Sequence, residues 1–196
     1  MKYILPVVEG EGDVQAVPEL IRRIAIDAGC FDLQVHRPHR RGDYRAVLSR
    51  FENYFRTAML EGAPILWVLD FDSDWKNDLV QETTRVRNLG NAISRTVPFE
   101  VVFMVQEYET MFLSDHETVK QFFDDIRDDY VFPSNPELVR DAKGTISKAR
   151  PRGFAYKPTQ HQRSLTSQVS LSPLRERSDS FRRFECAVLR LLEIAV

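Results

Sequence analysis

Three groups of acidic residues could do chemistry if the fold brings them together. They are Glu9, the pair Asp70 and Asp72, and the pair Glu107 and Glu109, and each group closely follows an apolar run. The carboxyl ends of parallel strands meet at one edge of a sheet, where ligands bind. Carboxylates gathered there repel one another unless a cation neutralises them. Oxygen ligands without His or Cys favour Mg²⁺ or Mn²⁺, so we predict a magnesium or manganese site formed by these five residues.

The spacing of Asp70 and Asp72 favours one shared ion. In an extended chain, alternate side chains point to the same side, so both carboxylates can converge while Phe71 points toward the packed helices. Asp74 is predicted to cap the next helix. A single acid at a strand end is commonly only a helix cap, so the prediction depends on the three groups occurring together.

Two other motifs match this segment only in part. The run from Asp70 resembles an EF-hand loop, but Trp75 stands where glycine is needed and Gln81 stands where a bidentate Glu belongs. Asp70-x-Asp72 also resembles the nucleophile motif of haloacid-dehalogenase phosphatases. That motif lies on the first strand of its fold, whereas here it follows the third predicted strand. A small-molecule phosphatase with a phospho-Asp70 intermediate is kept as an alternative.

The apolar pattern predicts alternating strands and helices over the first 110 residues. The strands are expected at 2–8, 31–35, 65–69 and 98–105, and the helices at 14–28, 43–60 and 76–94. This alternation is typical of an α/β fold with parallel strands and right-handed crossovers. We therefore predict a Rossmann-like, mostly parallel four-stranded sheet with helices on both faces.

The apolar pattern predicts that the remainder of the chain is mainly helical. Helices are expected within 111–127, from Asn135 to beyond Lys148, and after Ser178, with a basic loop at 150–158. We predict two parts: an α/β core at 1–110, and a helical, partly basic extension at 111–196 that packs on it.

Charge is distributed unevenly along the chain. Residues 1–139 contain 15 Lys or Arg and 24 Asp or Glu. Residues 140–183 contain 11 Lys or Arg and only three Asp or Glu. An acidic body with a basic C-terminal segment suits a metal site beside a surface that binds a polyanion. Simple charge balancing within the molecule is the alternative.

Basic residues at several positions are candidates for contacting a nucleic-acid backbone. They are Arg37, Arg40 and Arg41 after the second predicted strand, Lys157, and Arg182. Lys and Arg contacts to phosphate are largely independent of base sequence. Phe154 and Tyr156 lie among basic residues and could stack bases. The alternatives are a solvated basic loop and aromatic side chains that anchor the loop to the body.

The sequence predicts a cytoplasmic protein. No apolar run is long enough to span a bilayer. Cys30 and Cys186 lie in apolar surroundings without CxxC spacing, so we expect reduced core cysteines and no structural zinc site.

Two sets of motifs resemble known families. Val8-Glu9-Gly10-x-x-Asp13 followed later by Asp70-x-Asp72 resembles the Toprim domain of topoisomerases, primases and overcoming-lysogenization-defect nucleases. Almost the whole chain resembles a bacterial Toprim-like group, the domain-of-unknown-function family 4276. That second resemblance rests on the Glu9 and Asp70 motifs and on four others: Glu107-x-Glu109, Asp141-Ala142-Lys143, Tyr156-Lys157-Pro158-Thr159 and Ser180-Phe181-Arg182-Arg183-Phe184.

The resemblance implies a Toprim-like fold and phosphoryl-transfer chemistry. Glu9 is then expected as general acid/base or metal ligand, and Asp70 and Asp72 as Mg²⁺ ligands. Lys143 is expected to neutralise phosphate charge near the transition state. The implied activity is Mg²⁺-dependent hydrolysis of nucleic-acid phosphodiesters, with an ATPase partner and a role in phage defence.

A different class of function also fits the sequence. A non-catalytic binding or regulatory module would keep the fold and the acidic residues without turnover. No tyrosine is identifiable as a topoisomerase nucleophile, and nothing supplies the gates of a topoisomerase or the template-handling parts of a primase. A free-standing enzyme of either kind is therefore not expected.

Overall fold

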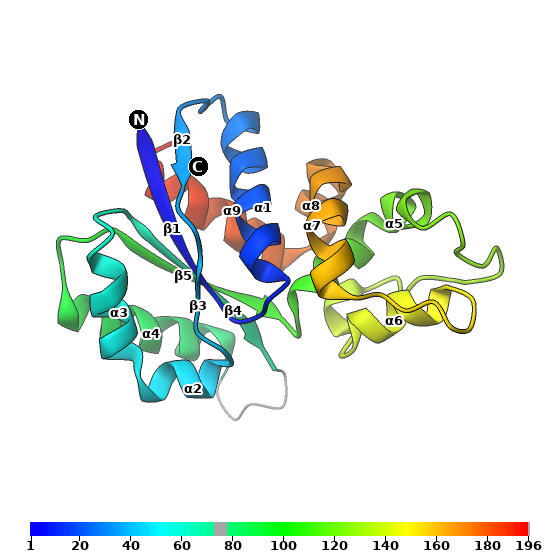
Figure 1. Cartoon of the computed structure of the whole chain (residues 1–196), viewed down its shortest axis with the longest axis horizontal. Coiled ribbons are helices and arrows are strands. Elements are labelled where there is room, and N and C mark those ends of the chain that lie inside the picture. Colours follow the sequence, from blue (N-terminus) through cyan, green and yellow to red (C-terminus); the bar gives the residue numbers. More distant parts are fainter. Residues whose placement is uncertain (73–77, 196) are drawn as a thin grey trace.

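A parallel β-sheet forms the centre of the molecule (Figure 1). The computed structural model describes residues 1–72 and 78–195. The described strands are β1 (Lys2–Val8), β2 (Leu33–Val35), β3 (His39–Arg40), β4 (Ile65–Phe71) and β5 (Phe99–Val105). Their order is β2–β1–β4–β5, with β3 also paired to β1, and every pairing is parallel. The predicted parallel α/β architecture is confirmed.

The short strand β3 was not expected from the sequence. Val7 pairs with His39 and Val8 with Arg40, and the Arg41 N–H donates to the Val8 carbonyl at 2.9 Å. A two-residue strand inside a basic loop carries no period-2 pattern, so only the neighbouring β1 backbone specifies it. The pairing holds the basic loop beside the end of β1.

Helices surround the sheet and extend beyond it. In the first part they are α1 (Asp13–Asp27), α2 (Tyr44–Ser49), α3 (Phe51–Met59) and α4 (Leu79–Ile93). The later ones are the 3₁₀ helices η1 (Tyr108–Asp115) and η2 (Pro136–Leu138), and α5 (His116–Phe122), α6 (Ala142–Ala149), α7 (Pro158–Gln168), α8 (Leu171–Arg177) and α9 (Asp179–Leu191). None of the described helices is long and apolar enough to cross a membrane.

Each face of the sheet has its own apolar core. Side chains of a strand alternate between faces, so Val8 and Val68 pack with α1 and α9, whereas Val7 and Trp67 pack with α2, α3 and α4. The first cluster continues without interruption into η1, α5, α6, α7 and α8. The helical part after residue 110 therefore shares its core with the sheet, and the boundary at residue 110 stays a prediction.

Three predicted helices differ from the observed ones. The helix expected from Asn135 is instead the short η2 followed by α6, which begins at Ala142 after its cap, Asp141. The segment 43–60 forms two helices that meet at Arg50, whose φ of −128° and ψ of 20° interrupt the helix. Asp43 caps α2 as predicted, accepting a hydrogen bond from the Ala46 N–H. The described part of the next helix begins at Leu79, capped by Asp78. The predicted cap, Asp74, lies outside the described residues.

The N-termini of α1 and α7 pack closely at Gly12. A Cβ atom on Gly12 would lie 1.9 Å from Oε1 of Gln162 and 2.8 Å from Cβ of Pro158. Only a residue without a side chain lets the two helices approach this closely. The contact brings the start of α7 to the carboxyl end of β1.

We expect Gly12→Ala to lower the free energy of unfolding by about 1–3 kcal/mol, because the added methyl overpacks this contact. Urea unfolding monitored by circular dichroism measures the change. The double variant Gly12→Ala/Gln162→Ala relieves the closest overlap and is expected to recover part of the loss. An unchanged unfolding midpoint in Gly12→Ala contradicts the close approach.

Candidate functional site

Glu9 lies immediately after β1 and points to the neighbouring strand β4. Its Oε1 accepts a hydrogen bond from the backbone N–H of Asp70 at 2.9 Å. Glycine follows at position 10, and its N–H donates to Oδ2 of Asp13 at 2.8 Å. The chain thus turns sharply from β1 into α1, and the turn leaves the Glu9 carboxylate at the carboxyl edge of the sheet.

Asp70 and Asp72 lie at the end of the adjacent strand. Asp70 is the last residue but one of β4, and Asp72 directly follows the strand and is exposed. Phe71 between them is buried and packs edge-on against Phe103, as expected from the alternation of side chains. Both carboxyl residues line one cavity together with Glu9.

Two adjoining cavities make up the candidate site. The first has a volume of about 340 Å³, and its lining includes Glu9, Asp70, Asp72 and Tyr44. The second has a volume of about 370 Å³. Its lining adds Asp13, Glu109, Lys143, Thr159 and Gln162 to Glu9 and Asp70. Because Glu9, Asp43 and Asp70 line both, the two cavities form one acidic cleft.

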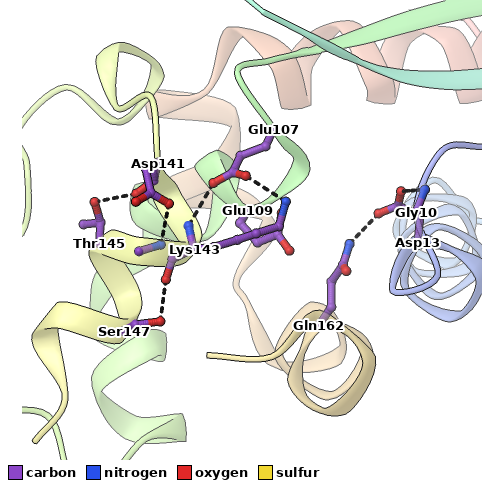
Figure 2. A network of polar contacts seen from close by, with 10 residues as sticks. Gly10, Asp13, Glu107, Glu109, Asp141, Lys143, Thr145, Ser147 and Gln162 are labelled. Carbon is purple, nitrogen blue, oxygen red and sulfur yellow. Dashed lines mark hydrogen bonds and ion pairs between the residues drawn. The ribbon is translucent and has the colours of Figure 1, made fainter. Parts of the chain in front are cut away.

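Lys143 lines the cleft, and its side chain contacts Glu107 (Figure 2). Its Nζ lies 2.7 Å from Oε2 of Glu107 and 3.2 Å from Oε2 of Glu109. The Lys143 backbone N–H also donates to Oε1 of Glu107 at 2.8 Å. Asp141 caps α6 by accepting from the Gly144 N–H, which fixes the helix turn that carries Lys143.

The structure separates the roles of the two predicted glutamates. Glu109 is 1% exposed and lines the cleft, and its Oε1 is buried without a hydrogen-bond partner among the described residues. Both oxygens of Glu107 contact Lys143, and Glu107 does not line either cavity. Glu109 is therefore placed for direct contact with a bound ion, and Glu107 for positioning Lys143.

Asp13 and Gln162 are site residues that the predicted set did not contain. The Gln162 amide donates to Oδ1 of Asp13 at 2.6 Å, so α7 holds the carboxylate that opens α1 (Figure 2). The Glu9-Gly10-x-x-Asp13 motif gave a signal for Asp13. Gln162 is 1% exposed and lies 149 residues away in sequence, and no spacing marked it.

The backbone at Gln106 turns the chain toward Lys143. Gln106 has a φ of 66°, the left-handed region that residues other than glycine seldom adopt. Its N–H donates to the Phe71 carbonyl at 2.8 Å, and it lines the first cavity. Non-glycine residues in this conformation cluster at functional sites.

Burial controls the ionisation of the acids. Burial raises the pKa of Glu9 to about 8 against the effect of the Asp70 hydrogen bond, and the charges of Asp13 and Asp43 raise it further. Burial, then Asp13 and Glu9, hold the pKa of Asp70 well above its usual range. Burial also raises the pKa of Glu109 to about 7 although Lys143 opposes the rise. Burial lowers the pKa of Lys143, but Glu109 and Glu107 outweigh it and raise that pKa overall.

These acids fit a hard divalent cation by donor type and by charge. The donors are carboxylate oxygens, which Mg²⁺ and Mn²⁺ prefer, and a dication favours the ionised forms that burial disfavours. Glu109, which lines the cleft, offers a further carboxylate. Within residues 1–72 and 78–195, no three His, Cys, Asp or Glu side chains already surround one point as metal ligands.

The predicted basic residues are dispersed. Arg40 pairs with Glu11 at 3.3 Å, and the Arg41 guanidinium lies 4.9 Å from the centre of the Tyr54 ring. Arg37 is exposed. Because β3 pairs with the end of β1, this basic loop lies beside the cleft.

The remaining basic candidates lie in different places. Lys157 is exposed and immediately precedes Pro158 and Thr159, which line the cleft. Arg182 lies on α9 and pairs with Asp179, and it lines a separate groove rather than the acidic cleft. Phe154 is 57% exposed, whereas Tyr156 is 5% exposed and belongs to the core.

The model of the family described as Domain of unknown function (DUF4276) matches residues 8–189 of this chain. The chain belongs to the DUF4276 family. The matched range contains every acidic residue of the cleft, as well as Lys143 and Gln162. No curated protein matches this DUF4276 chain.

Solved structures of the C-terminal region of the OLD protein from Xanthomonas campestris pv. campestris are similar to this DUF4276 chain. The structure phased with iodine is 13% identical over 97% of each chain, with a TM-score of 0.44. The structure phased with platinum is 12% identical, covering 98% of this chain and 96% of the other, with a TM-score of 0.42. At these values we draw no correspondence between individual residues.

We expect Glu9→Gln to stabilise the metal-free DUF4276 protein at pH 8 by about 1–3 kcal/mol, because burial penalises the ionised carboxylate. The pKa of Glu9 is raised from 4.5 to about 8, so its favourable contribution is full below pH 4.5 and is lost as the pH rises toward 8. Urea unfolding between pH 5 and 8.5 in EDTA measures the difference between the two proteins. Glu52→Gln, at an exposed position, is the control, and parallel pH curves for wild type and Glu9→Gln contradict the prediction.

We expect Lys143→Met to destabilise the protein by about 1–3 kcal/mol, with a larger loss at pH 8 than at pH 6. Burial raises the pKa of Glu109 to about 7, so without the ammonium group the buried Glu109 carboxylate loses its countercharge as it ionises over this pH range. Thermal unfolding at the two pH values tests this. Lys148→Met is the matched control because Lys148 is exposed on the same helix. A loss that is equal at both pH values shows that Lys143 acts by packing alone.

Proposed function

We propose that this protein is a Mg²⁺- or Mn²⁺-dependent, Toprim-like nuclease that hydrolyses nucleic-acid phosphodiesters. The observation that carries the proposal is the convergence of Glu9, Asp70 and Asp72 on one cleft whose lining also includes Lys143. Metal-assisted phosphodiester hydrolysis uses such an arrangement, with acids that hold a metal ion and a cation that meets the phosphate.

Glu9, Asp70 and Asp72 would hold the ion, with Glu109 as an additional oxygen donor. A bound Mg²⁺ supplies a Lewis acid that polarises a phosphoryl oxygen and lowers the pKa of water. Glu9 itself has a pKa raised to about 8, near the value suited to a group that accepts and returns a proton at neutral pH.

Lys143 would stabilise the negative charge that develops on the phosphate during the reaction. Its ammonium group is held by Glu107 outside the cavities and by Glu109 inside, so it enters the reaction already oriented. A preoriented cation stabilises developing negative charge without reorganising during the reaction. The hydrogen bond from Gln162 restrains the rotation of the Asp13 carboxylate, which lines the same cavity as Glu9.

The nucleic-acid backbone would reach the cleft across the basic loop of Arg37, Arg40 and Arg41 on one side. The start of α7, with Lys157, borders the cleft on another side. Backbone contacts of this kind give affinity that depends on salt and little on sequence. From the family resemblance we further propose an ATPase partner and a role in phage defence.

We expect purified protein to cleave DNA or RNA with Mg²⁺ or Mn²⁺, and Glu9→Ala and Asp70→Ala each to lower the rate at least about 100-fold. Circular dichroism and thermal melts establish that both variants fold. Glu52→Ala, a surface carboxylate outside the cleft, is expected to cleave at the wild-type rate. Chelation with EDTA is expected to stop the reaction, and added Mn²⁺ to restore it.

A non-catalytic binding module is the second candidate, favoured by the fact that Lys143 already neutralises Glu107 and Glu109. It predicts nucleic-acid binding that Glu9→Ala leaves unchanged and no cleavage under any metal. That pair of results, with folded protein, rejects the nuclease proposal. Turnover of a simple phosphate ester with a phospho-Asp70 intermediate identifies the phosphatase alternative.

A further inference from the structure

Two buried side chains, Glu109 and Tyr156, each carry a polar atom that has no hydrogen-bond partner among the described residues. The atoms are Oε1 of Glu109 and the hydroxyl oxygen of Tyr156. Glu109 is 1% exposed and Tyr156 is 5% exposed. Buried polar atoms are almost always paired, because an unpaired one loses its hydrogen bonds to water without replacement. Oε1 is an acceptor and the hydroxyl carries a donor, so each is a chemically suitable partner for the other.

Helix η1 carries Glu109 on the side where Tyr156 packs. Side chains three residues apart in a 3₁₀ helix lie one above the other, so Glu109 and Phe112 share a face of η1. The ring of Tyr156 packs against that of Phe112, with 6.4 Å between the ring centres. The Tyr156 side chain therefore lies along the face of η1 that holds Glu109.

Helix α6 ties the backbone of Tyr156 to the turn that carries Lys143. Oγ of Ser147 donates to the Lys143 carbonyl at 2.7 Å (Figure 2). The same oxygen accepts a hydrogen bond from the Tyr156 N–H at 3.0 Å. Tyr156 thus adjoins both elements that form the ion pair of Glu109 and Lys143.

The hydroxyl of Tyr156 is held in place as a protonated group. Three rings pack against the Tyr156 ring, those of Phe112, Phe123 and His161, with centres at 6.4, 6.4 and 5.7 Å. Burial raises the pKa of Tyr156, and the charge of Glu109 raises it further. The group therefore keeps its proton at neutral pH and is available as a hydrogen-bond donor.

The Glu109 carboxylate is restrained on one oxygen only. Lys143 Nζ lies 3.2 Å from its Oε2, whereas Oε1 is the atom without a partner. Carboxylates that bind metal ions are themselves oriented by hydrogen bonds from surrounding residues. Hydrogen bonds of this kind are often long before a ligand binds and shorten when it is bound.

We propose that Tyr156 is a positioning residue of the acidic cleft, whose hydroxyl donates to Oε1 of Glu109 when the cleft binds Mg²⁺ or Mn²⁺. With Lys143 on the other oxygen, this bond fixes the orientation of the carboxylate. Tyr156 is absent from the described lining of both cavities, so it acts through Glu109 and contacts neither the ion nor a substrate. The inference rests on the metal site of the proposed function and adds a residue that supports it.

Binding of Mn²⁺ to the full chain tests the proposal, measured by the loss of the electron paramagnetic resonance signal of the free ion. Tyr156→Phe keeps the ring and removes only the hydroxyl, and we expect it to weaken Mn²⁺ binding about tenfold. Tyr130→Phe is the matched control. It removes a hydroxyl that donates to the Thr145 carbonyl at 3.2 Å, away from the cleft lining, and is expected to bind Mn²⁺ as wild type does. Thermal melts establish that the variants fold.

Glu109→Met shows whether Tyr156 acts through Glu109, because it removes both carboxylate oxygens and keeps a side chain of similar length. In that background, we expect Tyr156→Phe to change the affinity for Mn²⁺ less than about twofold. A purely structural role of the hydroxyl predicts the same tenfold loss in both backgrounds, and that result overturns the proposal.

Two further outcomes separate this proposal from the proposed function. If wild type binds Mn²⁺ and Tyr156→Phe binds it equally well, the positioning role of Tyr156 is rejected while the metal site stands. If the wild-type protein binds no Mn²⁺, the metal site itself is rejected, and the positioning role is rejected with it.

Discussion

The candidate site depends on one electrostatic problem, the burial of several carboxyl groups in a single cleft. Glu9 directly follows β1 and Asp70 lies on the adjacent parallel strand β4, and the Glu9 carboxylate adds to the effect of burial in raising the pKa of Asp70. The protein meets this problem with directed hydrogen bonds and with the ammonium group of Lys143. The Asp70 N–H supports Glu9, and Lys143 supports Glu109 and Glu107. What remains is a site that a divalent cation would complete.

The later helices supply partners for these groups, since α6 packs against η1 and α7 packs against α1. Helix α6 delivers Lys143, and α7 delivers Gln162 to Asp13. Both helices belong to the same apolar cluster as β1, β4 and α1. The C-terminal part therefore supplies a wall of the cleft rather than a separate attachment. Gly12 permits the closest contact of this arrangement.

The basic residues that are concentrated in the C-terminal part of the sequence lie on two separate surfaces of the structure. Part of the basic excess in residues 140–183 lies at the cleft, in Lys143 and beside it in Lys157. Another part lies along the edge of β5, in Arg182 and Arg183. Charge counts along the chain cannot separate these surfaces, because α6 and the start of α7 lie at the cleft whereas α9 packs on β5 and β4.

The sequence by itself determined the parallel α/β architecture, the strand ends that carry Glu9, Asp70 and Asp72, and the final amphipathic helix. Those features follow from local patterns, namely apolar runs, helical spacing and caps such as Asp43. The tertiary structure alone decided the β3 pairing, the division of the 43–60 helix at Arg50, the contact of Gln162 with Asp13, and the different surroundings of Glu107 and Glu109. These features depend on contacts between residues far apart in sequence, and no local periodicity records such contacts.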